Sequence, residues 1–347
     1  MVVVKTAKLG GTASDVTVGK VAHGLMMMTW RDPNHPLPDE EAFEAIKAGV
    51  DAMPPGVKMF LNSGEFYGPN QSTANLELLA RFYEKYPEYA ERTFLSVKGG
   101  TKEGTLIPDA SPENLRRSVD AINAALRGTK RVDLFECARV AKNVPVEDAI
   151  KTLVELKNEG KFDHIGMSEC SAATLRRGNA VHPIAAVEIE VSLWSYEEET
   201  KKVIETAKEL GIAVVAYSPL GRGFLTGTIK SPQDLPEHDM RRHFSRFQEE
   251  NFKHNMAIVD SVKAIAAKKN VTPAQLSIAW VASRGSHVIP LPGSSSKKRN
   301  LENIAAGDVE LTEADLAEID EILAKHTVKG GRYRDDVDPE KVLHLWG

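Results

Sequence analysis

The feature of this sequence that most constrains its fold is a regular alternation of short apolar segments with amphipathic helical patterns. The apolar segments have the length of buried β-strands and recur eight times, at residues 21–27, 59–62, 93–98, 132–137, 164–167, 185–190, 213–217 and 288–290. Patterns of helical period lie at residues 39–52, 72–86, 111–127, 146–159, 171–181, 195–210, 257–283 and 297–305. Strands that are apolar on both faces and alternate with helices pair in parallel, and eight such units close into a barrel. The sequence therefore predicts an α/β fold, a (β/α)8 TIM barrel, in which residues 1–347 form one domain.

Three segments fall outside this repeat. Residues 2–21 have the pattern of a β-hairpin, which we expect to cover the floor of the barrel. Residues 223–256 are long, charged and aromatic, which indicates a substrate loop. The tail after Lys329 has no strong periodicity and is expected to fold over the barrel mouth.

Composition and charge exclude several classes of protein. The chain has 42% hydrophobic and 27% charged residues, a net charge of -5 and no long run of like charges, which argues against nucleic acid as the main partner. No apolar run approaches the ~18 residues of a membrane helix, and Lys5 and Lys8 interrupt the first apolar run too early for a signal peptide. The only cysteines, Cys137 and Cys170, are expected to be buried free thiols, and the protein is predicted to be cytosolic.

Polar side chains gather where the predicted strands end. The turn after the second strand carries four of them, Asn62, Ser63, Glu65 and Tyr67. The third strand ends in Lys98, and a later strand is followed by Tyr217, Ser218, Leu220, Gly221 and Arg222. In a βα barrel the carboxyl ends of the strands form the active face, so these residues are candidates for chemistry or for binding.

An anion-binding signal follows the last predicted strand. Residues 293–299 read Gly-Ser-Ser-Ser-Lys-Lys-Arg and begin a helix, and helix N-terminal amides with nearby hydroxyls and cations bind phosphate. The alternative is a Rossmann site at residues 221–223, but Thr226 stands where the third glycine should be and Pro232 breaks the helix that should follow. We therefore expect phosphate recognition at residues 293–299.

The order and spacing of these motifs resemble the aldo-keto reductase family over essentially the whole chain. The match includes the segment 166–172 and the closing run 288–303. The segments 64–68, Gly-Glu-Phe-Tyr-Gly, and 135–140, Phe-Glu-Cys-Ala-Arg-Val, are most similar to the fungal pyridoxal reductase branch. The resemblance implies a (β/α)8 barrel, a nicotinamide cofactor and a small carbonyl substrate.

The resemblance also implies where NADPH binds. The adenosine side falls on Gly293, Ser294, Lys298, Arg299, Glu302 and Asn303. Ser168, Glu169 and Glu188 match the residues that hold the nicotinamide carboxamide, Tyr217 the residue that stacks on the ring, and Ser218, Leu220, Gly221 and Arg222 the pyrophosphate strap. Glu169 stands where Asn is usual and Glu188 where Gln is usual, so each keeps an acceptor but lacks the amide donor. Three adjacent cations, Lys297, Lys298 and Arg299, favour a 2′-phosphate, hence NADPH over NADH.

Two members of the family's Asp, Tyr, Lys and His tetrad are absent. Tyr67 and Lys98 are present, but Asn62 replaces Asp and Ala138 replaces His. The ammonium of Lys98 is expected to lower the pKa of Tyr67 toward a value that suits a general acid. Without an ionised Asp, the pKa of Lys98 is itself expected to fall, and the small Ala138 leaves space for a ring-bearing aldehyde.

Glu136 is a candidate for the missing charge. Side chains alternate along a strand, so if Ala138 faces the barrel interior, Glu136 also does, one layer below. We hypothesise that Glu136 pairs with Lys98 from beneath and keeps it protonated, because a buried carboxylate is costly unless it is paired. The alternative is that Glu136 bonds to Asn62, Ser96 or water and has no catalytic part.

The combined expectation is an NADPH-dependent enzyme that reduces an aldehyde, with pyridoxal to pyridoxine as the reaction that the resemblance implies and Tyr67 as proton donor. A non-catalytic NADPH-binding sensor or channel-associated subunit of the same fold is the alternative. A sugar-phosphate isomerase or aldolase would share the barrel and its phosphate site, but the sequence offers no metal cluster for it.

Overall fold

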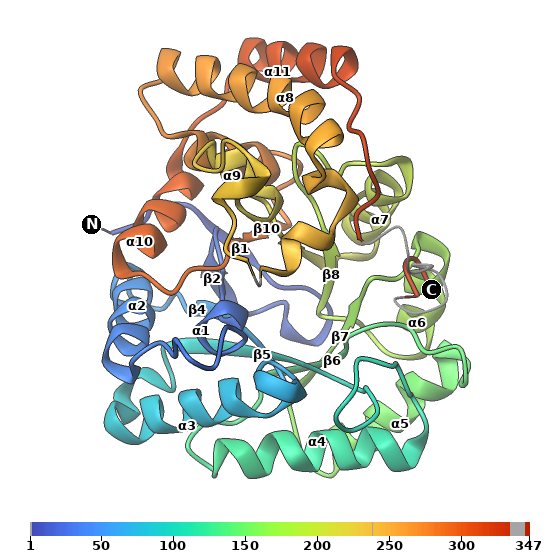
Figure 1. Cartoon of the computed structure of the whole chain (residues 1–347). Helices are drawn as coiled ribbons and strands as arrows, with labels where there is room; N and C mark the ends of the chain where they lie inside the picture. Colours follow the sequence, from blue (N-terminus) through green and yellow to red (C-terminus); the bar gives the residue numbers. More distant parts are fainter. Residues whose placement is uncertain (1, 238, 334–343) are drawn as a thin grey trace.

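A closed barrel of parallel strands forms the centre of the molecule (Figure 1). The structure, a computed structural model, describes residues 2–237, 239–333 and 344–347. Within them, eight parallel strands pair in chain order: β3 (His23–Gly24), β4 (Met59–Gly64), β5 (Thr93–Gly99), β6 (Leu134–Cys137), β7 (His164–Ser168), β8 (Ala186–Glu190), β9 (Ala213–Tyr217) and β10 (Val288–Leu291). A parallel bridge between Gly24 and Gly293 closes the ring. The predicted (β/α)8 barrel is confirmed.

Helices surround the strands, as Figure 1 shows. They are α2 (Asp39–Asp51), α3 (Ala74–Lys85), α4 (Pro112–Leu126), α5 (Val146–Asn158), α6 (Ala172–Val181), α7 (Glu198–Leu210), α8 (Glu249–Lys268), α9 (Pro273–Ala282), α10 (Lys297–Ala305) and α11 (Glu313–Lys325). Most of them bury an apolar stripe; in α3 the stripe includes Leu76, Leu79 and Phe82, all without exposed surface. Burial of both strand faces explains why the strands read as apolar runs.

The N-terminal hairpin closes the floor of the barrel, as predicted. Strands β1 (Thr6–Lys8) and β2 (Thr17–Gly19) are antiparallel, and their apolar side chains pack beneath Phe60 and Phe94 in the barrel interior. Gly10 is required at this contact, because a Cβ there would lie 2.1 Å from the carbonyl oxygen of Gly211.

Two predicted elements are wrong in their boundaries. The single helix expected at residues 257–283 is two helices, because Asn270 adopts a φ of 54° and Thr272 begins α9 with a capping box to Gln275. The first strand, expected at residues 21–27, shortens to β3 because a short helix, α1 (Met26–Thr29), begins directly after it.

The expected substrate loop at residues 223–256 is largely packed structure. It contains short 3-10 turns, and from Glu249 onward it belongs to α8. Its Phe247 and Phe252 are buried, and they surround Phe224, which itself stacks on Trp194 at 4.4 Å. These rings therefore hold the loop to the barrel and are not free to contact a substrate.

The chain after α11 turns back toward the carboxyl ends of the strands (Figure 1). Asn255 on α8 clamps Lys329 through two hydrogen bonds, its Nδ2 donating to the Lys329 oxygen at 3.0 Å and its Oδ1 accepting from the Lys329 nitrogen at 2.9 Å. Gly330 follows with a φ of 90°. The prediction that the tail folds over the mouth is confirmed for residues 329–333, whereas residues 334–343 lie outside the described part.

Two further findings bear on the cellular setting. Among the described residues, no helix is both long and apolar enough to cross a membrane. Cys137 and Cys170 are free thiols, and Cys170 is buried while Cys137 is half-buried.

Candidate active site

Tyr67 lies in the turn that follows β4, at the carboxyl end of the barrel. Its side chain is only 7% exposed and packs with Phe66 and Ala138. Trp30 covers the same cluster, with its ring centroid 5.8 Å from that of Tyr67. The ring of Tyr67 also lies over Gly64, where a Cβ would come within 3.0 Å of it. The turn therefore holds the phenol in one place, beside an aromatic wall.

Lys98, at the end of β5, is the cation nearest to this phenol. Its Nζ lies 5.5 Å from the centroid of the Tyr67 ring and is buried. It donates to Asn62 Oδ1 at 2.9 Å and forms a short ion pair with Glu188 on β8. Asn62 Nδ2 in turn donates to Glu188 Oε2 at 2.7 Å. Asn62, Lys98 and Glu188 thus form a closed ring of hydrogen bonds across the barrel.

Glu136 lies beside this ring, and its carboxyl is in hydrogen-bonding contact with that of Glu188. Its Cα pairs with that of Lys98 in the β5–β6 register, and its Oε1 accepts from Ser96 Oγ at 3.4 Å. In the described part of the chain, Lys98 has no ion pair with Glu136. The direct pairing of Glu136 with Lys98 is therefore absent, because Glu188 forms that ion pair, although the charge of Glu136 also contributes to raising the pKa of Lys98. The alternative contact with Ser96 is present. We call Asn62, Lys98, Glu136 and Glu188 the Lys98 cluster.

The charges of the Lys98 cluster reverse the expected pKa shifts. Burial alone would lower the pKa of Lys98, but the carboxylate of Glu188 raises it above its ordinary value. Burial also raises the pKa of Tyr67, with Lys98 opposing the change and Glu188 adding to it. Both groups were expected to shift downward because Asn62 carries no charge. Glu188 supplies that charge instead.

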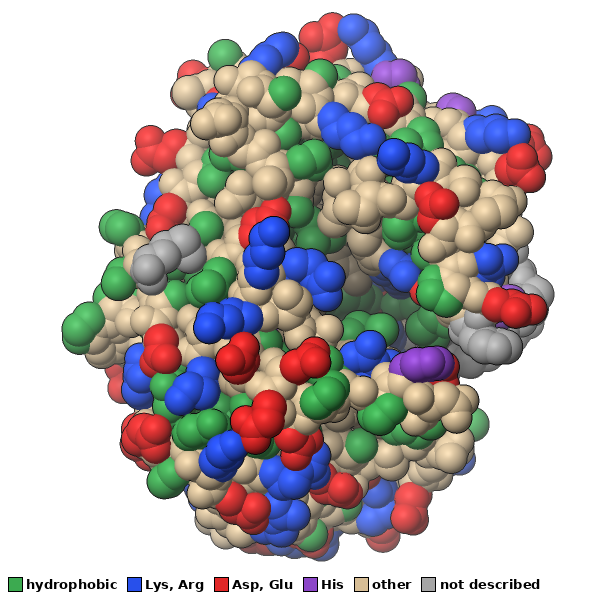
Figure 2. Space-filling view, turned by 60° about the vertical axis from the view of Figure 1, so that its left-hand side comes forward, with side chains coloured by type: hydrophobic (Ala, Val, Ile, Leu, Met, Phe, Trp, Pro, Cys, Tyr) green, Lys and Arg blue, Asp and Glu red, His purple; other side chains and the backbone are tan. Residues whose placement is uncertain are grey.

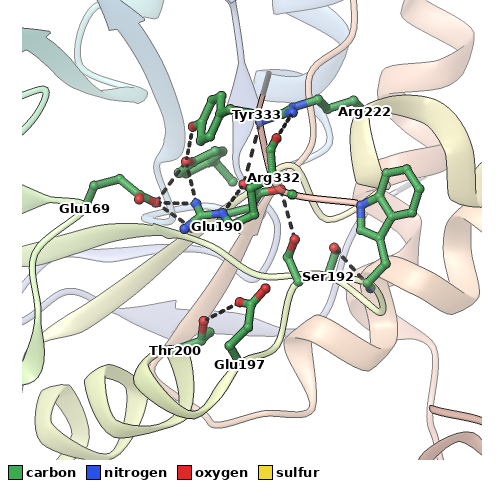
Figure 3. Close-up of polar contacts among 12 residues, drawn as sticks. Glu169, Glu190, Ser192, Glu197, Thr200, Arg222, Arg332 and Tyr333 are labelled. Carbon is green, nitrogen blue, oxygen red and sulfur yellow. Dashed lines mark hydrogen bonds and ion pairs between the residues drawn. The ribbon is translucent and has the colours of Figure 1, made fainter. Parts of the chain in front are cut away.

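A second charged cluster forms where the tail reaches the barrel. The guanidinium of Arg332 lies between two buried carboxylates (Figure 3). Its Nη2 donates to Glu169 Oε1 at 2.9 Å and its Nε donates to Glu190 Oε2 at 2.8 Å. Tyr217 joins the pair, since its hydroxyl donates to the same oxygen of Glu169 at 2.8 Å. We call Glu169, Glu190, Tyr217 and Arg332 the Arg332 cluster.

Arginines dominate the electrostatics of the Arg332 cluster. Burial opposes ionisation of Glu190, but three nearby guanidinium groups lower its pKa to about 2: those of Arg332, Arg222 and Arg246. Burial is the largest single effect on Glu169 and raises its pKa, but the charges of Arg332 and Arg139 and the hydrogen bond from Arg332 together lower it below its ordinary value. The Tyr217 hydroxyl behaves in the opposite way, because burial and the charge of Glu169 raise its pKa.

Several buried polar atoms around the Arg332 cluster have no hydrogen-bond partner in the described structure. They are Ser168 Oγ, Glu169 Oε2, Arg139 Nε and Arg332 Nη1. Buried polar groups are almost always satisfied, so unpaired donors and acceptors gathered in one place suit a polar ligand. A nicotinamide carboxamide, which has both a donor and an acceptor, fits this set.

The turn after β9 has the strained backbone of a ligand-binding loop. Ser218, Gly221 and Arg222 all have a positive φ, of 53°, 54° and 56°. Gly221 cannot be replaced freely, because a Cβ would lie 2.6 Å from the indole nitrogen of Trp194. The Arg222 guanidinium donates to the Arg332 oxygen at 2.6 Å, while Leu220 packs away from the turn against a small apolar cluster. This turn is where the pyrophosphate strap was expected.

The expected phosphate site lies at the start of α10. The buried Ser294 accepts from the Ser296 nitrogen at 3.1 Å, and Gly293 lies against Gly24. Three side chains that follow, Lys297, Lys298 and Arg299, are exposed and make no hydrogen bond or ion pair with any described residue. Figure 2 shows one face of the molecule hollowed near its centre, with blue Lys and Arg side chains along the hollow. Free cations at a helix start suit an anionic ligand.

The other two residues expected on the adenosine side of NADPH, Glu302 and Asn303, differ from these unpaired cations. Glu302 accepts from Thr272 Oγ1 at 2.7 Å and so is already engaged with the cap of α9. Asn303 is buried on the inner side of α10.

Comparison with known proteins now decides the family. The model of the Aldo/keto reductase family matches residues 20–324. The chain belongs to this family. It is therefore an oxidoreductase that uses a nicotinamide cofactor and acts on a small molecule.

Relatives of this aldo/keto reductase cover most of its length. A probable pyridoxal reductase 2 from Schizosaccharomyces pombe is 37% identical over 326 residues, 92% of this chain and 96% of that protein. An aldo-keto reductase of the same organism, yakc, whose name specifies NADP(+), is 37% identical over 79% of this chain and 81% of its own. Among solved structures, a glycerol dehydrogenase from Gluconobacter oxydans has a TM-score of 0.78 at 23% identity, covering 96% of this chain and 98% of its own, which shows the shared fold.

Not every polar residue at the strand ends of this aldo/keto reductase faces the site. Ser63 Oγ donates to Asn75 on α3 at 2.7 Å, and Glu65 binds Arg117 at 2.6 Å and Ser118 on α4. These side chains fasten the turn of Tyr67 to the helices outside. In the residues that the structure describes, no group of His, Cys, Asp and Glu side chains is arranged to hold a metal ion.

Sequence reasoning missed four residues of the site, one of which is Glu190. Arg332 and Tyr333 lie in a tail without periodicity, and Trp30 follows the first strand outside any motif. Tyr333 lies 3.1 Å from the Tyr217 hydroxyl and accepts from Arg139 Nη2 at 3.1 Å. The signal that was available is charge: two carboxylates at strand ends, Glu169 and Glu190, require a buried cation.

Proposed function

We propose that this aldo/keto reductase reduces an aldehyde to the alcohol with NADPH, and that its substrate is pyridoxal, which becomes pyridoxine. The observation that carries the proposal is the buried phenol of Tyr67 beside the charged ammonium of Lys98 at the carboxyl end of the barrel. Reduction of a carbonyl needs one proton donor, and this pair supplies it.

The residues of the Lys98 cluster handle the proton. NADPH, when bound, supplies the hydride that reaches the carbonyl carbon. Tyr67 donates its hydroxyl proton to the carbonyl oxygen, so hydride and proton together convert the aldehyde to an alcohol. The phenolate left on Tyr67 is stabilised by the ammonium of Lys98, which Glu188 keeps charged. Burial excludes water and strengthens both interactions.

The wall beside Tyr67 supports a ring-bearing substrate. Trp30 and Phe66 stand edge to face, 6.2 Å apart, and Met26 packs against the same cluster. Ala138 adds little bulk there, so space opens where a histidine would stand. A flat aromatic aldehyde can pack against such rings. The 37% identity to a probable pyridoxal reductase supports pyridoxal within this class.

Two sets of residues support NADPH. The unpaired cations Lys297, Lys298 and Arg299 suit a 2′-phosphate, and the relative whose name specifies NADP(+) agrees. At the other end, Glu169 lacks the amide donor that an asparagine would offer. Arg332 Nη1 is an unpaired donor next to it, so the two side chains together replace the missing amide toward the carboxamide.

The test is the absorbance of NADPH at about 340 nm with pyridoxal, an unsubstituted aromatic aldehyde and a short aliphatic aldehyde, each repeated with NADH. We expect turnover to be fastest with pyridoxal and NADPH. Faster turnover of the aliphatic aldehyde would contradict the aromatic pocket. Tight NADPH binding without turnover of any aldehyde would instead identify the non-catalytic sensor.

A further inference from the structure

A buried ammonium needs an opposite charge, and in this barrel the charge comes from an unexpected strand. Asn62, the neighbour of Lys98 on β4, is neutral, whereas Glu188 reaches Lys98 from β8. We propose that Glu188 is the positioning residue of the proton donor, because it holds Lys98 charged and directed at Tyr67. The carboxylate at position 188 and the neutral amide at position 62 can then be swapped without loss of this arrangement. The inference rests on the proposed function only in assigning the proton to Tyr67.

The hydrogen bonds explain why the two residues are interchangeable. Lys98 donates to one oxygen of each, and Asn62 Nδ2 donates to the second oxygen of Glu188 at 2.7 Å. If Asn62 became Asp and Glu188 became Gln, Lys98 would still donate to two oxygens. Only the third bond would reverse, with the Gln amide donating to the Asp carboxylate. The number of bonds and the net charge would stay the same.

Few titratable groups in the described structure face Glu188. They are Lys98 on β5, Glu136 on β6 and Tyr67 after β4, and each of the three feels its charge. Glu190 lies on the same strand but pairs with Arg332. Burial and the charge of Glu188 raise the pKa of Glu136 well above its usual range, and the ammonium of Lys98 opposes that rise.

The competing role for Glu188 is a direct contact with the cofactor carboxamide, which the family resemblance implies for its position. The two roles predict different measurements. Loss of a cofactor contact changes the affinity for NADPH and leaves kcat at saturating NADPH unchanged. Loss of a positioning residue changes kcat and its pH dependence. Both oxygens of Glu188 are already used within the cluster, which favours positioning.

The experiment compares five variants of the full chain: Glu188→Gln, Asn62→Asp, the double variant of these two, Glu136→Gln as the matched loss of a buried carboxyl, and Glu136→Gln combined with Asn62→Asp. For each, kcat with pyridoxal is measured across pH, NADPH binding by fluorescence, and Tm by calorimetry. We expect Glu188→Gln to lower kcat about 10²-fold, within the range for proton-transfer groups, with little change in NADPH affinity. The basic limb of kcat should move to lower pH, because Lys98 and Tyr67 both lose the charge that raises their pKa.

Rescue is the decisive result. Asn62→Asp alone places two carboxylates in contact and should lower both kcat and Tm. Combined with Glu188→Gln, it should recover most of kcat, the basic limb and Tm. In a Glu136→Gln background, Asn62→Asp should recover nothing. A double variant no better than the worse single variant would overturn the proposal, as would a Glu188→Gln enzyme with weaker NADPH binding and unchanged kcat.

Tm separates this inference from the proposed function. If the wild-type protein reduces no aldehyde, the proposed function fails, while recovery of Tm in the double variant would still establish the exchange of charge between Asn62 and Glu188. If the wild type is active and Tm does not recover, the charge exchange fails and the proposed function stands.

Discussion

Two buried charged clusters meet at the mouth of this barrel, and they are built in different ways. The Lys98 cluster takes every member from a barrel strand: Asn62 from β4, Lys98 from β5, Glu136 from β6 and Glu188 from β8. The Arg332 cluster takes its carboxylates from the barrel region but its cation from the tail. The first cluster is therefore as rigid as the barrel, while the second is complete only when the tail has docked.

The balance of charge also differs between the two clusters, and it decides whether the pKa of a buried carboxyl rises or falls. In the Lys98 cluster two carboxyls share one cation, and the pKa of Glu136 rises well above its usual range. Around the Arg332 cluster, Arg222 and Arg246 add their charges to that of Arg332, and the pKa of Glu190 falls to about 2. Burial is nearly the same, at 1% and 2% exposure. The comparison shows that neighbouring charges, not burial alone, set the sign of the shift.

Removal of the proton donor should have the largest effect. Tyr67→Phe is expected to lower kcat about 10³-fold and leave the affinity for NADPH nearly unchanged, because the hydroxyl acts only in the transition state. Steady-state kinetics and a fluorescence titration of NADPH measure the two quantities. Retention of more than a tenth of kcat would exclude Tyr67 as the acid.

Disruption of the Arg332 cluster should weaken NADPH binding more than it lowers kcat. Arg332→Ala removes the donor next to Glu169 and is expected to weaken NADPH binding about 10- to 100-fold, with a smaller change in kcat. Lys329→Ala is the matched control, since Lys329 lies in the same segment with an exposed side chain. Tighter NADPH binding in Arg332→Ala would show that the tail competes with the cofactor.

The depressed pKa of Glu190 predicts a dependence of stability on pH. Its carboxyl has an ordinary pKa of 4.5 and a folded value of about 2, so its stabilising effect is present above pH 4.5 and is lost as pH falls toward 2. The shift corresponds to about 3 kcal/mol. Urea unfolding of wild type and Glu190→Gln from about pH 5 to about pH 3 should show a shrinking difference in free energy of unfolding. A difference that does not change with pH would contradict the ion pairs of Glu190.

The smallest expected effect concerns the choice of cofactor. Lys298→Ala with Arg299→Ala should weaken NADPH about tenfold and NADH hardly at all, because exposed cations act mainly on the 2′-phosphate. The ratio of the two dissociation constants is the measurement, and NADH serves as the internal control. Equal weakening of both cofactors would show that these cations do not recognise that phosphate.

The sequence predicted the barrel and the position of the candidate residues Asn62 and Lys98 because both follow from local patterns. Strands buried on both faces read as apolar runs, and the residues that end them, such as Asn62 and Lys98, must lie at one edge. The pairing of Lys98 with Glu188 could not be read in the same way. It crosses the barrel between strands that are not neighbours, and the sequence does not specify which inward side chains meet there.

Other errors have equally physical reasons. The expected pKa shift of Lys98 had the wrong sign because it depended on this unrecognised pair, and that of Tyr67 had the wrong sign mainly because burial raises its pKa. Arg332 was missed because the sequence of the tail has no periodic pattern. The tail is held through its backbone instead, by the two hydrogen bonds between Asn255 and Lys329 and by the positive φ of Gly330. The break between α8 and α9 was overlooked although Thr272 and Gln275 carried a helix-start signal.

The late position of Arg332 in the chain has a consequence for biosynthesis. The last barrel strand ends at Leu291, and domains begin to fold from the N-terminus as they emerge during synthesis. The strands that carry Tyr67 and Lys98 are all available to a growing chain before Arg332 has been added. A growing chain can thus form the strands of the Lys98 cluster while the carboxylates of Glu169 and Glu190 still lack the cation that pairs with them, so the Arg332 cluster is completed last.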